Sequence, residues 1–223
     1  VLMSYGALIR GNSGQTIIDD VNPCMHIVES GTYGVQGATE LVISYSNPIN
    51  SPYEPYVYVR PNGPHQIYQF RHLGGPGAWT GFAFYQSIFR DTEPPVYGGQ
   101  WKAAAVMLPR TGGWGLQVFD GQSRVMFDSN REIVRFVGGA QTWSKYAFNP
   151  NWPGGMRLQT WAMPYPYEAS TYYMVSHFNL KPWFTLEPPR VGFLYSSRTT
   201  IFASALVPDE TNRPFNWPLI VIA

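Results

Sequence analysis

Apolar and polar residues alternate along most of the chain in short runs that are typical of β-strands. Such runs recur about every ten residues, and Pro, Gly or Asn bounds almost every one. Examples are ATELVISYS, YEPYVYVRP, HQIYQFRHL, WTGFAFYQSIF, STYYMVSHF and TIFASALVP. KAAAVMLP comes nearest to a helix, but it has no capping residue and Pro109 ends it, so we expect a strand there. The pattern predicts an all-β protein, a sandwich or a barrel, with little or no helix.

Two segments with the same pattern open the two halves of the chain. SYGALIRGNSGQTIIDD begins at Ser4 and GWGLQVFDGQSRVMFDS begins at Gly113, and they align at a constant offset of 109 residues. Each reads as strand, tight turn, strand, because Asn, Asp and Gly tolerate the positive φ angles of hairpin turns. We interpret the likeness as an internal repeat and predict two β-sandwich-like modules, residues 1–111 and 112–223, each opening with a hairpin. The alternative is that two unrelated hairpins share a common pattern.

The composition is that of a folded protein with few charges. Charged residues make up 13% of the chain and aromatic residues 16%, whereas disordered chains are poor in aromatics and rich in net charge. The net charge is +1 and Lys and Arg are scattered, so we expect no nucleic-acid partner. The single cysteine, Cys24, excludes an internal disulfide, and we expect it to be a small core residue. The opening residues lack signal-peptide features, and the longest apolar run, PLIVIA, is too short to span a bilayer.

No sequence pattern marks a catalytic, cofactor or metal site. There is no Gly-x-Ser-x-Gly turn, and GGPGAWTG lacks the Gly-Lys-Ser/Thr sequence of a phosphate loop. No two histidines have the close spacing of a metal-ligand pair. His65 and His72 are seven residues apart on one predicted strand, which would place them on opposite faces. We expect no cofactor and no metal.

The carboxylates also argue against an enzyme. The adjacent acidic pairs would point to opposite faces of a strand, whereas a glycosidase needs two carboxylates that face each other. Two distant carboxylates meeting in the fold would be the alternative. Asp19 and Asp128 occupy matching positions in the repeat, and we expect them to accept hydrogen bonds from backbone N–H groups, as in Asx turns. We therefore predict a protein that is not an enzyme.

Aromatic side chains give the one positive indication of binding. SPYEPYVYV, GAWTGFAFY, NPNWPGG and MPYPYEASTYYM place Tyr and Trp in or beside loops rich in Pro and Gly. Loops lie on the surface, where aromatic clusters stack on sugars or anchor protein partners. The candidate binding residues are Trp79, Trp152, Tyr165 and Tyr167. The alternative is that these rings fill the core of the sandwich.

The two repeated segments resemble a family of uncharacterised structural proteins of tailed bacteriophages, encoded near tail-tip and tail-fibre genes. The shared pattern is an aromatic residue, Gly, alternating apolar residues, a turn, and then two apolar residues before Asp-Ser. In the second copy these positions are Trp114, Gly115, Leu116, Val118, Gly121, Val125, Phe127, Asp128 and Ser129. In the first copy they are Tyr5, Gly6, Ile9, Gly14, Ile17, Ile18 and Asp19, and Asp20 departs from the pattern by standing where the second copy has Ser129.

The resemblance implies a non-enzymatic virion protein located in the tail, at the tail tip or the fibre attachment. It also implies assembly with other virion proteins and with its own copies, as a trimer or hexamer, and contact with a host surface glycan or protein. We expect PLIVIA to be a buried strand that pairs either within the same sandwich or with another subunit. The alternatives are a capsid decoration protein, a carbohydrate-binding or receptor-binding module, and a polysaccharide-degrading enzyme.

Overall fold

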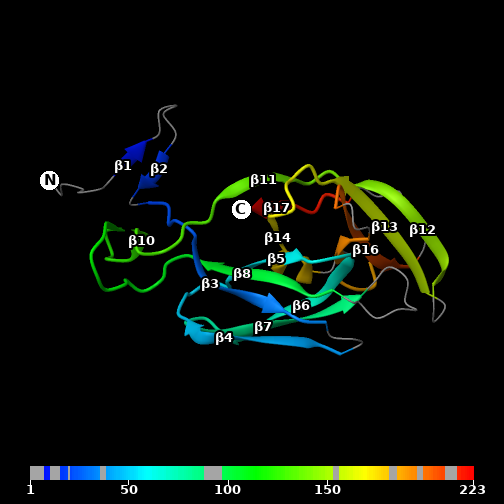
Figure 1. Ribbon diagram of the computed structural model, residues 1–223, viewed down its shortest axis with the longest axis horizontal. Coiled ribbons are helices and arrows are strands. Elements are labelled where there is room, and N and C mark those ends of the chain that lie inside the picture. The colour runs from blue at the N-terminus through cyan, green and yellow to red at the C-terminus, as the bar shows by residue number, and fades with distance from the viewer. Residues whose placement is uncertain are drawn as a thin grey trace.

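The alternating runs form β-strands that are arranged in two large sheets and two small hairpins (Figure 1). The computed structural model describes residues 8–10, 16–19, 21–35, 39–87, 97–152, 156–180, 185–194, 198–208 and 215–223. Within them lie strands β1 to β17 and one 3-10 turn, η2 (Ser176–Asn179), but no α-helix. The prediction of an all-β fold is therefore confirmed, and the first half of the KAAAVMLP run forms the end of a strand.

One large sheet has six strands, all antiparallel to their neighbours. Their order is β11–β17–β14–β5–β8–β3. The bounds are β3 His26–Tyr33, β5 Tyr56–Pro61, β8 Gly99–Ala105, β11 Phe136–Ala140, β14 Tyr172–Met174 and β17 Leu219–Ile222. The PLIVIA run supplies β17, which lies between β11 and β14. This run is a buried strand, as predicted, and both of its partners belong to the same sandwich.

The other large sheet has seven antiparallel strands. Their order is β12–β13–β16–β15–β6–β7–β4. The bounds are β4 Leu41–Ile49, β6 His65–Gly75, β7 Ala78–Ser87, β12 Ser144–Trp152, β13 Met156–Pro164, β15 Arg190–Phe193 and β16 Thr200–Val207. The turn from β6 to β7 uses Gly74 and Gly77, whose φ angles of 89° and 83° favour glycine.

The two halves of the chain supply matching halves of both sheets. From the centre outwards, the first half contributes β5, β8, β3 to one sheet and the second half contributes β14, β17, β11. The other sheet follows the same rule. From the centre outwards, the first half contributes β6, β7 and β4, and the second half contributes β15, β16 and β13, with β12 as an additional edge strand. The halves meet where β5 pairs antiparallel with β14 and β6 with β15. The fold is thus a pseudo-twofold repeat in which residues 1–111 and 112–223 form one continuous sandwich rather than two separate ones.

A single core runs through the sandwich between the sheets. Large aromatic side chains from both halves are buried there and pack edge to face or stacked. Phe82 lies 5.3 Å from Trp101, and Trp161 lies 4.8 Å from Phe215, measured between ring centroids. Burying one such side chain contributes about 2–3 kcal/mol, and a ring pair adds about 0.5–1.5 kcal/mol. The aromatic content of the sequence is therefore used largely inside the sandwich.

The strand β6 contains an irregularity that changes which face its residues occupy. Its register with β7 shifts between Tyr68 and Arg71, and Gln69 has a φ of 50°. Before the shift, His65 is buried and bonds to the Tyr33 hydroxyl at 3.0 Å. After it, the His72 ring packs edge-on against Phe70 of the same core. The expectation that the two histidines lie on opposite faces is wrong, because the bulge adds a residue and moves His72 to the inner face.

The two repeated segments form hairpins with the same register. The strands are β1 Leu8–Arg10, β2 Thr16–Asp19, β9 Gln117–Phe119 and β10 Val125–Asp128. The first hairpin pairs Leu8 with Asp19, Ile9 with Ile18 and Arg10 with Thr16; the second pairs Gln117 with Asp128, Val118 with Phe127 and Phe119 with Val125. Every pair in the second set lies 109 residues after its counterpart, and both ladders skip one residue at the matching position. The predicted internal repeat is therefore present in the strand pairing itself.

Candidate functional site

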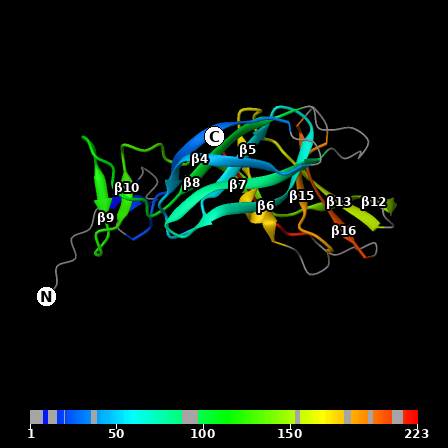
Figure 2. The same ribbon diagram turned by 90° about the horizontal axis from the view of Figure 1, so that it is seen from below.

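The two hairpins pack against each other at one end of the molecule, away from the β12–β13 end (Figures 1 and 2). We call the described residues within 8–25 and 111–134 the hairpin unit. Its buried centre consists of Ile18, Val118, Met126 and Phe127, with half-buried Cys24 packed against them. The expectation that Cys24 is a small packing residue agrees with this position. Because so few side chains are buried, the unit depends on its attachments to the sandwich.

Two connecting segments tie the hairpin unit to the sandwich, and they run side by side. The N–H of Val134 donates to the Met25 carbonyl at 2.9 Å, and the N–H of Ile27 donates to the Glu132 carbonyl at 2.8 Å. The N–H of Cys24 also donates to the Met126 carbonyl at 2.7 Å. Each connection leads from its hairpin into an edge strand of the six-stranded sheet, β3 in the first half and β11 in the second.

A buried carboxylate organises the base of the second hairpin. Asp128 accepts hydrogen bonds from the Thr111 hydroxyl at 2.7 Å, the Gln117 amide at 2.9 Å and the Asn130 N–H at 2.9 Å. The bond from Asn130 is the expected Asx turn; the side chain of Asp19, its counterpart, lies outside what the structure describes. Burial on its own would raise the pKa of Asp128, but the hydrogen bonds from Thr111, Asn130 and Gln117 lower that pKa to about 2.

His26 links this carboxylate region to the six-stranded sheet. Its Nε2 atom accepts a hydrogen bond from the backbone N–H of Asp128 at 3.3 Å, so the ring must be neutral at that nitrogen. Burial and the positive charge of Arg131 lower the pKa of His26, which favours the neutral form. The arrangement around Asp128 and His26 is structural, since both groups are buried and their hydrogen bonds are made within the chain.

Large apolar side chains are concentrated on the outside of the hairpin unit. Trp114 is 99% exposed. The other exposed apolar residues of the unit are Leu8, Ile9, Val21, Leu116, Phe119 and Ile133, and β11, which follows the unit in the chain, exposes Phe136 and Val137. Exposed apolar groups gathered in this way mark surfaces that other proteins cover. The described part of the hairpin unit therefore exposes several large apolar side chains, in contrast to its small buried centre.

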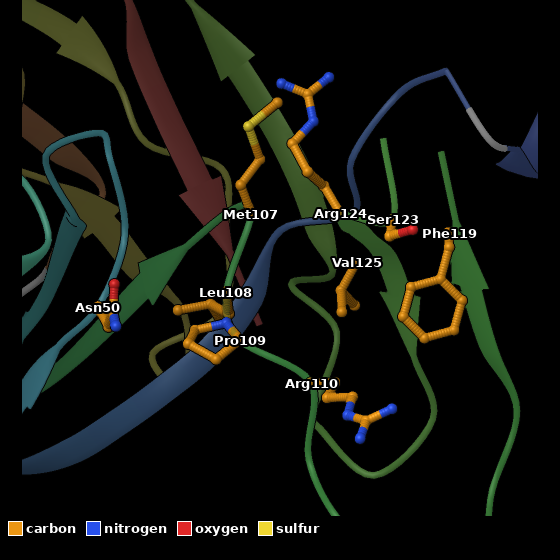
Figure 3. A pocket seen from close by; sticks show the side chains of 9 residues that line it. All are labelled: Asn50, Met107, Leu108, Pro109, Arg110, Phe119, Ser123, Arg124 and Val125. Atoms are coloured by element: carbon orange, nitrogen blue, oxygen red, sulfur yellow. The ribbon is translucent and has the colours of Figure 1, made fainter. Parts of the chain in front are cut away.

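A cleft lies between the hairpin unit and the sandwich (Figure 3). Leu108 and Pro109 approach it from the sandwich side, and Phe119 and Val125 from the second hairpin. Its volume is about 270 Å3, which is below the range of about 300–1,000 Å3 that is usual for small-molecule sites. Arg124, at its edge, is held by Asp120 at 2.5 Å. The cleft therefore marks the boundary between the hairpin unit and the sandwich, and it is smaller than a usual ligand pocket.

The four aromatic residues proposed from the sequence do not form a surface cluster. Trp79 is 6% exposed and its indole N–H donates to the Ser51 carbonyl at 3.1 Å. Tyr165 is 2% exposed, and its hydroxyl bonds to that of Thr171 at 2.9 Å. Tyr167 is half-buried and packs edge-on against Tyr165 at 5.0 Å. The side chain of Trp152 lies outside what the structure describes.

The prediction that these rings contact a ligand is wrong for Trp79 and Tyr165, because both are packed in the sandwich core. Trp79 belongs to β7, and Tyr165 follows directly on β13, so each continues the inward-facing side of a strand instead of standing on a loop. The SPYEPYVYV stretch was also singled out for its aromatics, and there two tyrosines do remain exposed, Tyr53 and Tyr56.

The described residues contain no group of three or more His, Cys, Asp or Glu side chains that could hold a metal ion. Nor does that part of the chain include a helix long and apolar enough to cross a membrane. Comparisons of the chain with protein-family models, with curated proteins and with solved structures found no significant match.

Proposed function

We propose that this chain is a non-enzymatic structural protein of a bacteriophage virion, a tail component at the tail tip or the fibre attachment. Its hairpin unit is the surface through which it assembles with its own copies and with other tail proteins. The observation that carries the proposal is the concentration of exposed apolar side chains on that unit, led by Trp114. Assembly would remove this surface from water, which is the main driving force of protein association.

The resemblance supports the tail location, and it involves the same surface. The residues that carry it in the second copy form β9, β10 and the segment before them, including the exposed Trp114 and Leu116. A closed ring of copies, a trimer or hexamer, would bury such a surface symmetrically on every subunit. A capsid decoration protein would use an apolar assembly surface in the same way, so location in the particle distinguishes these two roles.

The first experiment measures assembly directly. The molar mass of the purified chain is determined by light scattering, together with that of Trp114→Ser and Phe136→Ser variants. We expect a discrete oligomer for the natural sequence and a shift to smaller species for the variants. Tyr146→Ser is the control, since Tyr146 is also an exposed aromatic residue but lies on β12, at the other end of the molecule. A stable monomer that binds no neighbouring virion protein would refute the proposal.

The second experiment locates the protein. Antibodies against the chain, with gold labelling of intact particles from its source, should mark the tail tip or the fibre attachment. Label on the head would favour a decoration protein, and the absence of label from every particle would end the virion proposal.

A further inference from the structure

A second and larger hollow lies on the sandwich, where the two halves of the chain meet. Its volume is about 720 Å3, well within the usual range for ligand sites. We call it the seam groove. Its lining residues include Tyr53, Glu54, Pro55, Tyr56, His72, Ser176, His177, Asn179 and Leu180. The first half supplies Pro23, Tyr53 to Tyr56, His72 and Val106, whereas the second half supplies Ser176, His177, Asn179 and Leu180.

The walls of the seam groove are held together across the junction of the halves. The backbone N–H of Val57 donates to the Ser176 hydroxyl at 3.2 Å, and the N–H of Val175 donates to the Val57 carbonyl at 2.9 Å. These bonds continue the pairing of β5 with β14. The groove is therefore built mainly into the sandwich, and Pro23 is its one described lining residue from the hairpin unit.

Two tyrosines give the seam groove flat apolar surfaces that face solvent. Tyr53 is 54% exposed and Tyr56 is 38% exposed, and Leu180 is an exposed apolar residue on the opposite wall. Their rings differ in this respect from the many aromatics that are buried between the sheets. Exposed aromatic faces of this kind bind ligands that present apolar C–H groups.

Polar groups that lack partners lie beside these rings. The His72 side chain is only 5% exposed, and neither of its ring nitrogens has a hydrogen-bond partner. Its Nε2 atom is 3.7 Å from a carboxylate oxygen of Glu54, whose side chain is 62% exposed. His177 has one nitrogen on the Pro218 carbonyl, while its Nδ1 atom has no partner. These ring nitrogens are buried, so the exposed carboxylate of Glu54 is the group beside the tyrosines that a ligand hydroxyl can reach.

The charges of the seam groove restrict the class of ligand. Its described lining residues include the carboxylate of Glu54 but no Lys or Arg. Burial lowers the pKa of His72, with Glu54 opposing this effect, and burial lowers the pKa of His177 to about 4, so the imidazoles add little positive charge at neutral pH. Among the described lining residues, phosphate, sulfate and carboxylate groups would therefore find no cation, which argues against anionic ligands.

The geometry also argues against a peptide added as an extra strand. The strand nearest the groove, β5, is paired on both sides, with β8 and β14, so it offers no free edge. A proline-rich peptide lying on the tyrosines is the remaining alternative of that class. Sugar hydroxyls fit better beside the exposed carboxylate of Glu54, because a hydroxyl donates a hydrogen bond to a carboxylate oxygen.

We propose that the seam groove binds a neutral oligosaccharide. Tyr53 and Tyr56 stack against sugar rings, and Glu54 accepts hydrogen bonds from sugar hydroxyls. His72 lies beside Glu54, with its Nε2 atom 3.7 Å from a carboxylate oxygen. The proposal goes beyond an assembly role and does not depend on it, since the tyrosines and the carboxylate that carry it lie on the sandwich, outside the hairpin unit.

The test uses the full chain on an array that carries neutral oligosaccharides, sialylated and sulfated oligosaccharides, and proline-rich peptides. The neutral oligosaccharide with the strongest signal is then titrated calorimetrically against the natural chain and its variants. We expect the Tyr53→Ala/Tyr56→Ala variant to bind it about tenfold more weakly or worse. Glu54→Gln should also weaken binding. Trp114→Ala is the matched control, because it removes an even more exposed aromatic ring outside the groove and should leave the affinity unchanged.

Binding of no neutral oligosaccharide by the natural chain would overturn the proposal. So would binding that survives the double tyrosine variant, or binding confined to charged sugars or to proline-rich peptides. Because both tyrosines are exposed, their replacement should leave the melting temperature close to that of the natural chain, and this is measured alongside. The array uses purified protein, so its outcome is independent of where the protein lies in a particle and of whether it is a virion component at all.

Discussion

Replacing Asp128 by Asn tests whether a buried carboxylate holds the hairpin unit in place. One carboxylate oxygen, Oδ2, receives three hydrogen bonds, from the N–H and the hydroxyl of Thr111 and from the Gln117 amide, at 3.2, 2.7 and 2.9 Å. The other oxygen accepts the Asn130 N–H at 2.9 Å. An asparagine has only one oxygen, so one side of this arrangement must face an NH2 group. With the amide nitrogen in place of Oδ2, the Thr111 N–H and the Gln117 N–H lose their acceptor.

The size of the effect follows from the number of bonds lost. A hydrogen bond to a charged group contributes about 1.5–3 kcal/mol, and losses within one network do not add fully. We therefore expect Asp128→Asn to lower the free energy of unfolding of the hairpin unit by about 2–4 kcal/mol at neutral pH. The pKa of Asp128 is about 2 in the folded chain against an ordinary value of 3.8. Its contribution is thus present above pH 3.8 and is lost as the pH falls towards 2.

Amide hydrogen exchange of individual residues measures this effect, because it separates opening of the hairpin unit from unfolding of the sandwich. Protection should fall at Val118 and Met126 and stay the same at Phe82 in the core. Glu132→Gln is the control: its carboxylate lies in the same unit but is exposed, and its contact with Lys102 at 3.2 Å should contribute little. A change below about 0.5 kcal/mol in Asp128→Asn, or one equal to the control, would show that the carboxylate is not structural.

Three further predictions concern the sandwich. Gly81→Ala would place its Cβ atom 2.1 Å from the Ile43 carbonyl oxygen on the neighbouring strand β4. This clash should lower the free energy of unfolding by about 1–3 kcal/mol or more. Urea denaturation measures the loss, and an unchanged midpoint would contradict the prediction. Burial lowers the pKa of His65 to about 4, so the stability of the fold should fall as the pH drops from 6.5 to 4. In urea denaturation midpoints measured at several pH values, His65→Gln should show a smaller fall. His72→Phe removes two unpartnered buried nitrogens and should raise the melting temperature; a lower one would mean that its weak contact with Glu54 stabilises the fold.

The sequence was sufficient to predict the class of fold and its internal repeat. Alternation with a period of two and frequent turn residues identify strands because both are local properties of the chain. The repeat was visible for the same reason, since the hairpin registers depend on turn chemistry within about a dozen residues. The pairing of β5 with β14 and of β6 with β15 was not predictable in this way, because it joins segments more than a hundred residues apart.

The candidate binding residues were the least predictable feature. Whether an aromatic residue faces solvent depends on what the opposite sheet places over it, and local sequence does not contain that information. Trp79 and Tyr165 were therefore assigned to a surface although they belong to the core. The bulge at Gln69 is a similar case. It moves His72 to the other face of the strand, and no Gly, Pro, Asn or Asp in HQIYQFRHL indicates its position. The tyrosines of SPYEPY were visible as a signal, but only the junction of the halves shows that they line a groove.

The pseudo-twofold arrangement leads to a prediction about the halves themselves. Residues 1–111 on their own would leave β5 and β6 as sheet edges, although Val57, Tyr58 and Val59 are fully buried in the whole chain. Such edges pair with other strands when they are left open. Because β5 meets β14 antiparallel across a pseudo-twofold axis, a second copy of the same half could take the place of the missing one. We expect the isolated first half to form a dimer by light scattering, with a core that needs both copies. A folded monomer would show that the first half forms its own core, and that β5 and β6 do not need their partner strands from the second half.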